Sequence, residues 1–186
     1  MNIIKTVFED ALILEPDVHK DSRGFFTESY NDRHLKKLGI PCDFVQDNHS
    51  LSLEAGILRG LHFQSNPKAQ SKLVRVTQGA ICDVIVDLRK DSPTYKKYES
   101  FILSSYNFRQ LYVPKGFAHG FCTLVPNTEV QYKVDQYYSP EHDAGIYWND
   151  PELGILWPVS NPKLSDKDLL LPAIAELEES IHLGGS

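Results

Sequence analysis

Short strand-like segments fill the middle of the chain, and their spacing restricts the folds that are open to it. From about residue 40 to residue 150, turn-forming Gly, Pro, Asn and Ser recur roughly every 8–15 residues. The segments between them include 73–77, 81–88, 100–104, 109–113 and 129–138. This spacing leaves no room for helices between successive strands, and it is typical of an antiparallel sandwich or barrel.

Two of these segments allow a more specific expectation. Residues 73–77 and 81–88 flank Gln78–Gly79, which predicts a hairpin. Within 129–138, Tyr132 and Tyr138 are six positions apart, so on one continuous strand they face the same way.

Helices are expected only at the periphery. Asn31 is a suitable N-cap for a short helix that ends at Gly39, and a second helix is expected to begin near Ser165 and to stop before Pro172. The sequence therefore predicts a mostly β fold with a few short peripheral helices.

The composition is that of one ordinary globular domain. With 186 residues, 41% hydrophobic and 24% charged, the chain is long enough for one core and too short for two full domains. We assign residues 1–182 to that domain and regard 183–186 as a flexible tail or a remnant of protein expression.

The charge balance and the cysteines bear on partners and location. Nineteen basic against 25 acidic residues give a net charge of −6, which disfavours nucleic acid and means that an anionic ligand needs a local cluster of cations. The N-terminus has no secretory pattern, and no segment approaches the roughly 18 apolar residues of a membrane span. Cys42, Cys82 and Cys122 form no CxxC pair, and Cys82 lies in an apolar run, where we expect a core residue. We therefore expect a reduced, cytoplasmic protein that does not bind membranes.

His62 lies in the segment Leu-Arg-Gly-Leu-His-Phe-Gln, between apolar residues. From its context alone it is a hydrogen-bonded core histidine or a general base. Arg59 is three positions away, so a regular strand would point the two side chains to opposite faces. A bulge at Gly60 would bring both to one face, and bulges gather beside active sites.

A metal site is not expected in this segment. Gly56 and His62 resemble the start of the cupin metal motif, but Gln64 stands at the second histidine position, and Lys68 or Ala69 stands at the carboxylate position. This pattern disfavours a metal-dependent cupin oxygenase.

Other polar residues also allow a structural and a functional interpretation. Arg59 and Lys72 adjoin apolar strand residues. A cation in that setting is better suited to binding an anionic ligand or an oxyanion than to being a solvated surface charge. Tyr132 is a packing residue or a proton donor. Asp168 follows Ser165 by three positions, and this spacing is typical of a helix start. The alternative interpretation is that the carboxylate of Asp168 orients a histidine.

Five motifs together are more specific than any one of them. Between residues 23 and 151 the chain contains, in order, Arg-Gly-Phe-Phe-x-Glu, Gln-Asp-Asn-His-Ser, Leu-Arg-Gly-Leu-His-Phe-Gln, Pro-Lys-Gly-Phe-Ala-His-Gly-Phe and Gly-Ile-x-Trp-Asn-Asp-Pro. With these motifs the chain closely resembles the dTDP-4-dehydrorhamnose 3,5-epimerase family, from about residue 3 to residue 178.

The resemblance implies a cupin jelly roll without metal or other cofactor, working as a homodimer in dTDP-L-rhamnose biosynthesis. It implies the substrate dTDP-4-dehydro-6-deoxy-D-glucose, which is inverted at carbons 3 and 5. Both carbons adjoin the carbon-4 ketone, so each proton can leave to give an enolate. That chemistry needs a base, an acid on the other face and a group that holds the oxyanion.

The resemblance also implies roles for individual residues. His62 matches the base, Asp168 the carboxylate that orients it, Tyr132 the acid and Lys72 the lysine beside the ketone oxygen. The implied substrate contacts, of which Arg59 is placed on the diphosphate and some nucleotide-side residues come from the partner subunit, are Arg23, Glu28, Asp47, Asn48, His49, Arg59, His119, Tyr138, Asp143 and Lys167. Asp143 stands where the family often has Glu.

Several alternatives stay open from the sequence. Asp83 is a second candidate for the carboxylate beside His62. A mono-epimerase acting at carbon 3 or carbon 5 alone would use the same His–Tyr pair. A catalytically silent nucleotide-sugar-binding cupin would be expected to lack the base, the acid or the lysine, and His62, Tyr132 and Lys72 are all present.

Overall fold

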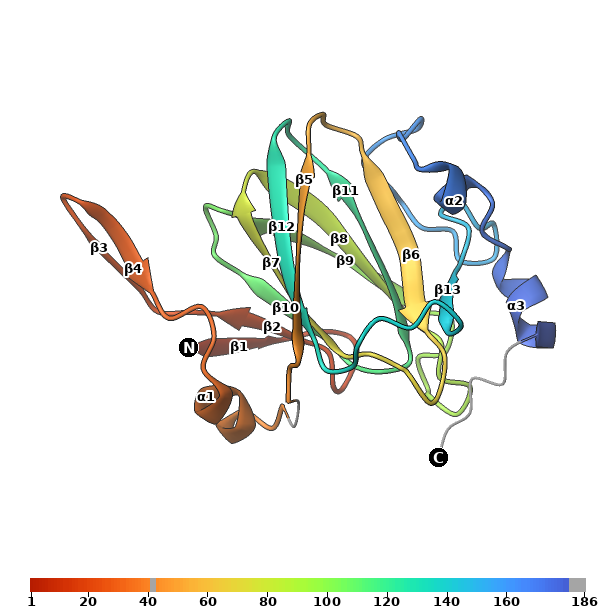
Figure 1. Ribbon diagram of the computed structural model, residues 1–186, viewed down its shortest axis with the longest axis horizontal. Helices are drawn as coiled ribbons and strands as arrows, with labels where there is room; N and C mark the ends of the chain where they lie inside the picture. The colour runs from red at the N-terminus through yellow and green to blue at the C-terminus, as the bar shows by residue number, and fades with distance from the viewer. Residues whose placement is uncertain (41–42, 181–186) are drawn as a thin grey trace.

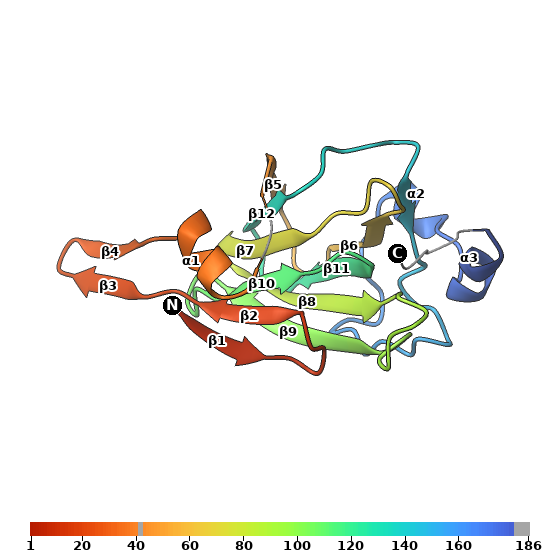
Figure 2. The same ribbon diagram turned by 90° about the horizontal axis from the view of Figure 1, so that it is seen from below.

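The computed structural model describes residues 1–40 and 43–180, which form two antiparallel sheets packed face to face (Figure 1 and Figure 2). The six-stranded sheet runs, in spatial order, β1 (Asn2–Lys5), β2 (Leu12–Glu15), β10 (Gln110–Val113), β7 (Lys72–Gln78), β12 (Thr128–Val134) and β5 (Gln46–Ser52). The five-stranded sheet runs β13 (Asp143–Gly145), β6 (Leu58–Gln64), β11 (Phe117–Thr123), β8 (Ala80–Asp87) and β9 (Tyr98–Ser104). The mostly β sandwich predicted from the spacing of turns is confirmed.

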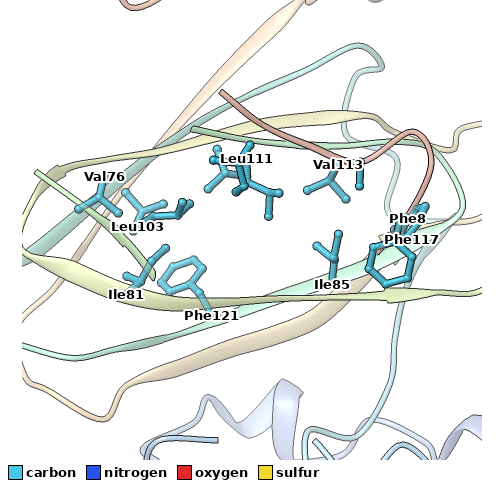
Figure 3. Packing of buried hydrophobic residues seen from close by; sticks show 13 residues of the cluster. Phe8, Val76, Ile81, Ile85, Leu103, Leu111, Val113, Phe117 and Phe121 are labelled. Carbon is cyan, nitrogen blue, oxygen red and sulfur yellow. The ribbon is translucent and has the colours of Figure 1, made fainter. Parts of the chain in front are cut away.

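The main core lies between the two sheets, as Figure 3 shows. Alternate residues of the central strands point inward, so Val76 and Leu111 of one sheet meet Ile81 and Phe121 of the other. Strand β8 is buried at almost every position because its outer face is covered as well. This double burial explains why the segment 81–88 is apolar at every position except Asp83 and Asp87.

Two smaller cores cover the outer faces of the sheets. Ile146, Ile174 and Leu177 of the C-terminal part pack on the five-stranded sheet, in a cluster that includes Cys82. The expectation that Cys82 is a core residue is confirmed, whereas Cys42 and the predicted tail 183–186 lie outside the described residues. On the outer face of the six-stranded sheet, Leu35 of α1 (Asp32–Lys37) packs in a second cluster with Leu14, Leu73 and Tyr112.

The predicted hairpin of 73–77 with 81–88 is wrong. Strand β7 belongs to the six-stranded sheet and β8 to the five-stranded sheet, so the turn carries the chain across the sandwich. Gly79 has φ +81°, and a Cβ there would lie 2.3 Å from Oγ1 of Thr128. The Gln-Gly pair therefore marks a tight corner between sheets, which local sequence does not distinguish from a hairpin turn.

The helix starts agree with the sequence. Asn31 caps α1, and Ser165 caps α2 (Asp166–Leu169). A third helix, α3 (Ile174–Ser180), was not expected. The predicted strand 129–138 is too long, because β12 ends at Val134 and Tyr138 lies in the segment that follows.

A two-stranded arm extends away from the body of the molecule. It consists of β3 (Val18–Asp21) and β4 (Gly24–Thr27), and Figures 1 and 2 both show it projecting beyond the sandwich. Phe25 and Phe26 on this arm are 60% and 72% exposed. Among residues 1–40 and 43–180, no helix has the length and apolar character needed to span a membrane.

Candidate active site

One cavity of about 570 Å³ is lined by both sheets and by the segment that carries α2. It lies among β5, β7 and β12 on one side and β6, β11 and β13 on the other. Of the residues expected to act on or bind a substrate, it brings together Asn48, Arg59, His62, Lys72, His119, Tyr132, Tyr138, Asp143, Lys167 and Asp168.

An irregularity in β6 brings Arg59 and His62 to this cavity together. His62 pairs with His119 of β11, but Arg59 pairs with Phe121, so β6 contains one extra residue between the two pairs. Gly60 has φ +118°, and a Cβ on it would lie 2.6 Å from Cα of Gly120. Only glycine fits both the backbone angle and the close approach. The predicted bulge at Gly60 is confirmed.

The imidazole of His62 is held by Asp168. Nε2 of His62 lies 2.7 Å from Oδ1 of Asp168, whose other oxygen accepts the backbone N–H of Gly60 at 3.3 Å. Burial opposes ionisation of Asp168, but the hydrogen bonds of His62, Gly60 and Ser165 outweigh it and hold the pKa below its ordinary value. An ionised carboxylate only accepts hydrogen bonds, so Nε2 carries a proton and Nδ1 is the basic nitrogen of the neutral ring.

Ser165 positions Asp168 by capping the helix that carries it. The Ser165 hydroxyl accepts the backbone N–H of Asp168 at 3.2 Å and so fixes the first turn of α2. Both interpretations of the Ser-x-x-Asp motif are therefore compatible: Ser165 caps the helix, and the carboxylate of Asp168 contacts His62.

Asp83 contacts a different histidine. His119 Nε2 lies 3.0 Å from Oδ2 of Asp83, and the two side chains are buried. Burial lowers the pKa of His119, and Asp83 opposes this effect. Of the two carboxylates left open by the sequence, Asp168 is the one in contact with His62.

Lys72 is a buried cation on β7. Its side chain is almost fully enclosed, and its Nζ donates to the backbone carbonyl of His62 at 3.2 Å. Burial lowers the pKa of Lys72 to about 8, although the carboxylates of Asp83 and Asp143 oppose the fall. Among the described residues, no carboxylate forms a salt bridge with it.

Tyr132 approaches the cavity from the sheet opposite His62. It lies on β12 beside Asn48 of β5, and its ring packs against the main core. Burial raises the pKa of Tyr132, so the phenol stays protonated at neutral pH. No hydrogen bond of its hydroxyl is found within the described part of the chain.

Three polar side chains meet at the exposed side of the cavity. Oδ2 of Asp143 accepts the hydroxyl of Tyr138 at 3.0 Å and the ammonium of Lys167 at 2.5 Å. These hydrogen bonds raise the pKa of both Tyr138 and Lys167. Tyr138 thus belongs to the same cavity as Tyr132, although it does not lie on β12.

Four of the expected binding residues lie elsewhere in the single chain. Arg23 is on the projecting arm, where it pairs with Asp21, and Glu28 follows the arm and pairs with His34. Asp47 and His49 point out of the sandwich and pair with Lys133 and Glu129.

Strand alternation explains the division of the Asp-Asn-His run. On β5, Asn48 faces the cavity and its two neighbours face outward. Gln46 and Ser50, on the same face as Asn48, also line the cavity, and sequence reasoning did not select them. A strict reading with a period of two would have found both.

Gln64, at the position of the second cupin histidine, has another function. Its amide nitrogen donates to the carbonyls of Lys68 and Tyr137, and its oxygen accepts the N–H of Ser139. It therefore connects the loops below the cavity. Across residues 1–40 and 43–180, no three His, Cys, Asp or Glu side chains converge as metal ligands.

Comparison of the sequence with known proteins identifies a family and individual relatives. The family model described as dTDP-4-dehydrorhamnose 3,5-epimerase matches residues 5–176. The dTDP-4-dehydrorhamnose 3,5-epimerase of Shigella flexneri is 52% identical over 170 residues, which are 91% of this chain and 93% of that protein.

Solved structures agree with the sequence relatives. The epimerase of Bacillus anthracis strain Ames, with TDP and PPi bound, has a TM-score of 0.92 and 65% identity over 93% of this chain and 99% of its own. The 3,5-epimerase of Legionella pneumophila, in complex with dTDP-4-keto-L-rhamnose, has a TM-score of 0.93 and 42% identity over 100% and 99%. A 3'-monoepimerase of Streptomyces bikiniensis, in complex with dTDP-quinovose, has a TM-score of 0.87 and 30% identity over 94% and 88%.

Proposed function

The chain belongs to the dTDP-4-dehydrorhamnose 3,5-epimerase family, and from this premise we propose that His62 and Tyr132 carry the two proton transfers of a 3,5-epimerisation. The family members named above are isomerases. The observation that carries the proposal is that His62 and Tyr132 reach one cavity from opposite sheets. Inversion at carbon needs this arrangement, because one proton leaves from one face and another arrives at the other.

The substrate is dTDP-4-dehydro-6-deoxy-D-glucose and the product dTDP-4-dehydro-L-rhamnose. A base removes the proton from carbon 3 or carbon 5, and the C–H electron pair passes into a C=C bond as the carbon-4 carbonyl becomes an enolate. A proton then adds to the opposite face, and the carbonyl is restored. The reaction has no net oxidation or reduction, and exchange of protons with water returns the base and the acid to their starting states before the second inversion.

His62 is the base in this proposal. Its Nε2 donates to Asp168, which leaves Nδ1 to take the carbon-bound proton. The carboxylate then stabilises the imidazolium that forms, at a hydrogen-bond distance of 2.7 Å. Tyr132 is the acid, since burial raises the pKa of its phenol and keeps the proton available.

Lys72 holds the enolate oxygen. The buried ammonium of Lys72 stabilises a developing oxyanion far better than an ammonium in water does. The carbonyl of His62, to which Lys72 donates, keeps the ammonium beside the base.

The remaining cavity residues supply the binding of a nucleotide sugar. Arg59 is suited to the diphosphate because a guanidinium forks onto phosphate oxygens. Asn48, His119, Tyr138, Asp143 and Lys167 supply further polar contacts around the sugar and the nucleotide.

A homodimer completes the site in this proposal. The arm of β3 and β4 carries Arg23 away from its own cavity and exposes Phe25 and Phe26. Exposed aromatic rings on a projecting arm favour packing against another subunit. We assign Arg23, Glu28, Asp47 and His49 to nucleotide contacts that form across such a dimer.

The free cysteines favour a cytoplasmic location. Cys82 and Cys122 are both buried and unpaired, as expected of a protein in a reducing compartment.

The experiment separates the two proton carriers by exchange in deuterium oxide. His62→Ala is expected to abolish exchange of both sugar protons. Tyr132→Phe is expected to slow inversion by about 10²–10⁴-fold and still to allow exchange with retention, because His62 can return a deuteron to the face from which it took the proton. Turnover of either variant within a few-fold of the unmodified enzyme would remove its assigned role.

A further inference from the structure

Asp83 is a buried carboxylate to which the proposed reaction gives no task. It lies on β8 with 0% exposure, and it is flanked along the strand by the core residues Ile81 and Ile85. Because alternate residues face the same way, its side chain points into the sandwich. A charge in such a place is unfavourable unless another group compensates it.

His119 satisfies only part of this carboxylate. Its Nε2 lies 3.0 Å from both oxygens, yet only Oδ2 receives a properly oriented hydrogen bond. Oδ1 is buried and has no hydrogen-bond donor among the described residues. The hydrogen-bonding capacity of this buried side chain is therefore only partly used by the described residues.

Lys72 is the buried cation on the opposing sheet. It has the same strand parity as Val74 and Val76, which belong to the core between the sheets, so its side chain also points inward. No carboxylate is in salt-bridge contact with it in residues 1–40 and 43–180, although Asp83 and Asp143 act on it electrostatically. Asp143 already accepts hydrogen bonds from Tyr138 and Lys167, which leaves Asp83 as the less neutralised of the two charges.

We propose that Asp83 is a positioning residue for the reaction, which acts from beneath the cavity to keep Lys72 cationic and to hold His119 in place. The inference rests on the proposed function of Lys72 as the group that stabilises the enolate oxygen. Asp83 touches no substrate in this account, and its effect is carried entirely by Lys72 and His119.

The sign of the effect follows from the charges. Burial drives Lys72 toward the neutral amine, and the Asp83 carboxylate opposes this effect. Removing the carboxylate therefore makes Lys72 lose its proton at lower pH. The other titratable groups that share the cavity with Lys72 are Arg59, His62, His119, Tyr132, Tyr138, Asp143, Lys163, Lys167 and Asp168, and Asp83→Asn leaves all of them in place.

The test follows Lys72 directly, without turnover. Protein labelled with ¹³C at the lysine Cε is titrated by NMR, and the Lys72 signal is identified by its absence in Lys72→Arg. Asp83→Asn keeps the shape of the side chain and is expected to lower the Lys72 midpoint by at least about one pH unit. Asp83→Ser removes the same charge with less bulk, so the result does not depend on one substitution. Asp83→Glu keeps the carboxylate and is expected to keep the Lys72 midpoint close to that of the unmodified protein.

Asp87→Asn is the matched control. Asp87 lies on the same strand and is equally buried, but its carboxylate binds Arg89, Ser92 and Thr94 away from the cavity. It is expected to leave the Lys72 midpoint unchanged. An unchanged midpoint in the folded Asp83 variants, or an equal fall in Asp87→Asn, would overturn the proposal.

Turnover separates this inference from the proposed function. If both hold, Asp83→Asn has nearly the normal kcat/KM at pH 6.5 and a kcat/KM lower by about fivefold or more at pH 8, because a midpoint near 7 leaves about a tenth of Lys72 in the free enzyme protonated there. If Asp83→Asn shifts the Lys72 midpoint but Lys72→Met does not change the rate, the link between Asp83 and Lys72 stands and the proposed role of Lys72 is rejected. A normal midpoint with a pH profile identical to that of the unmodified enzyme would reject the link alone.

Discussion

His62 Nε2 lies 2.7 Å from Asp168 Oδ1, although 106 positions separate the two residues in the chain. The contact forms because α2 lies against β6, where the bulge at Gly60 turns both a backbone N–H and the imidazole toward the same carboxylate. A base from one sheet is thus oriented by a helix that follows both sheets in sequence.

Removing the charge of Asp168 is expected to impair the base. Asp168→Asn can donate to the imidazole through its amide, which favours the wrong tautomer and removes the stabilisation of the imidazolium. We expect turnover to fall by about 10²-fold or more, with a changed tautomer in ¹⁵N spectra of His62. Ser165→Ala, which removes the cap and keeps the carboxylate, is the control and should lose much less activity. Equal losses in the two variants would indicate that only the helix matters.

The bulge in β6 is expected to be intolerant of any side chain. Gly60→Ala would place a Cβ 2.6 Å from Cα of Gly120 and 2.8 Å from the carbonyl of His119, which are backbone atoms. We expect the free energy of unfolding to fall by at least about 2 kcal/mol. Gly39→Ala is the control, since Gly39 also has positive φ but no neighbour within 4 Å, and it should lose only about 1 kcal/mol. Chemical denaturation measures both, and similar losses would contradict the role of the close approach.

The activity is expected to fall on the alkaline side as Lys72 loses its proton. The pKa of this buried lysine is about 8, so the cation that holds the enolate oxygen is present below that pH and lost above it. The value of kcat/KM, which reports the free enzyme, should decline above pH about 8, whereas an exposed lysine would keep its charge to about pH 10. A profile that stays flat to pH 9.5 would show that the charge of Lys72 is not required.

The projecting arm predicts a dimer that binds nucleotide across its interface. The unmodified protein should sediment at about twice the 21.1 kDa of one chain. Arg23→Ala should raise the Kd for dTDP at least about tenfold, because a guanidinium–phosphate contact is lost. Arg33→Ala, an exposed arginine of α1, is the control and should not change the Kd. A monomer with normal affinity for dTDP would contradict the completed site.

The sequence predicts the scaffold better than its connections. Period-two patterning indicates the sandwich, and the cap residues Asn31 and Ser165 mark two helices, because these signals are local. The sequence predicts a hairpin at Gly79, because a glycine turn has the same local sequence whether the next strand pairs with the first or joins the other sheet. The helix α3 has local signals as well, since Pro172 precedes a run of Ala, Glu and Leu, and the Asp150 carboxylate accepts the N–H of its first residue, Ile174, from 24 positions earlier.

The candidate site divides in the same way. The bulge could be derived from Arg59, Gly60 and His62, since parity and glycine chemistry are readable within one strand. The choice between Asp168 and Asp83 needed the fold, because both carboxylates are far from His62 in sequence and each contacts a histidine. Alternation along β5 predicts that Asp47 and His49 face away from Asn48, and the motif taken as one unit does not make this distinction.

The central claim is tested most directly by incubating the protein with dTDP-4-dehydro-6-deoxy-D-glucose in deuterium oxide and following the sugar protons by NMR. We predict deuterium incorporation and inversion at both carbon 3 and carbon 5, and none in a His62→Ala control. Exchange confined to one carbon would instead assign the chain to the mono-epimerases, of which a relative with the same fold is known. Absence of exchange at both carbons would contradict the account of His62, Tyr132 and Lys72 as a proton-transfer site.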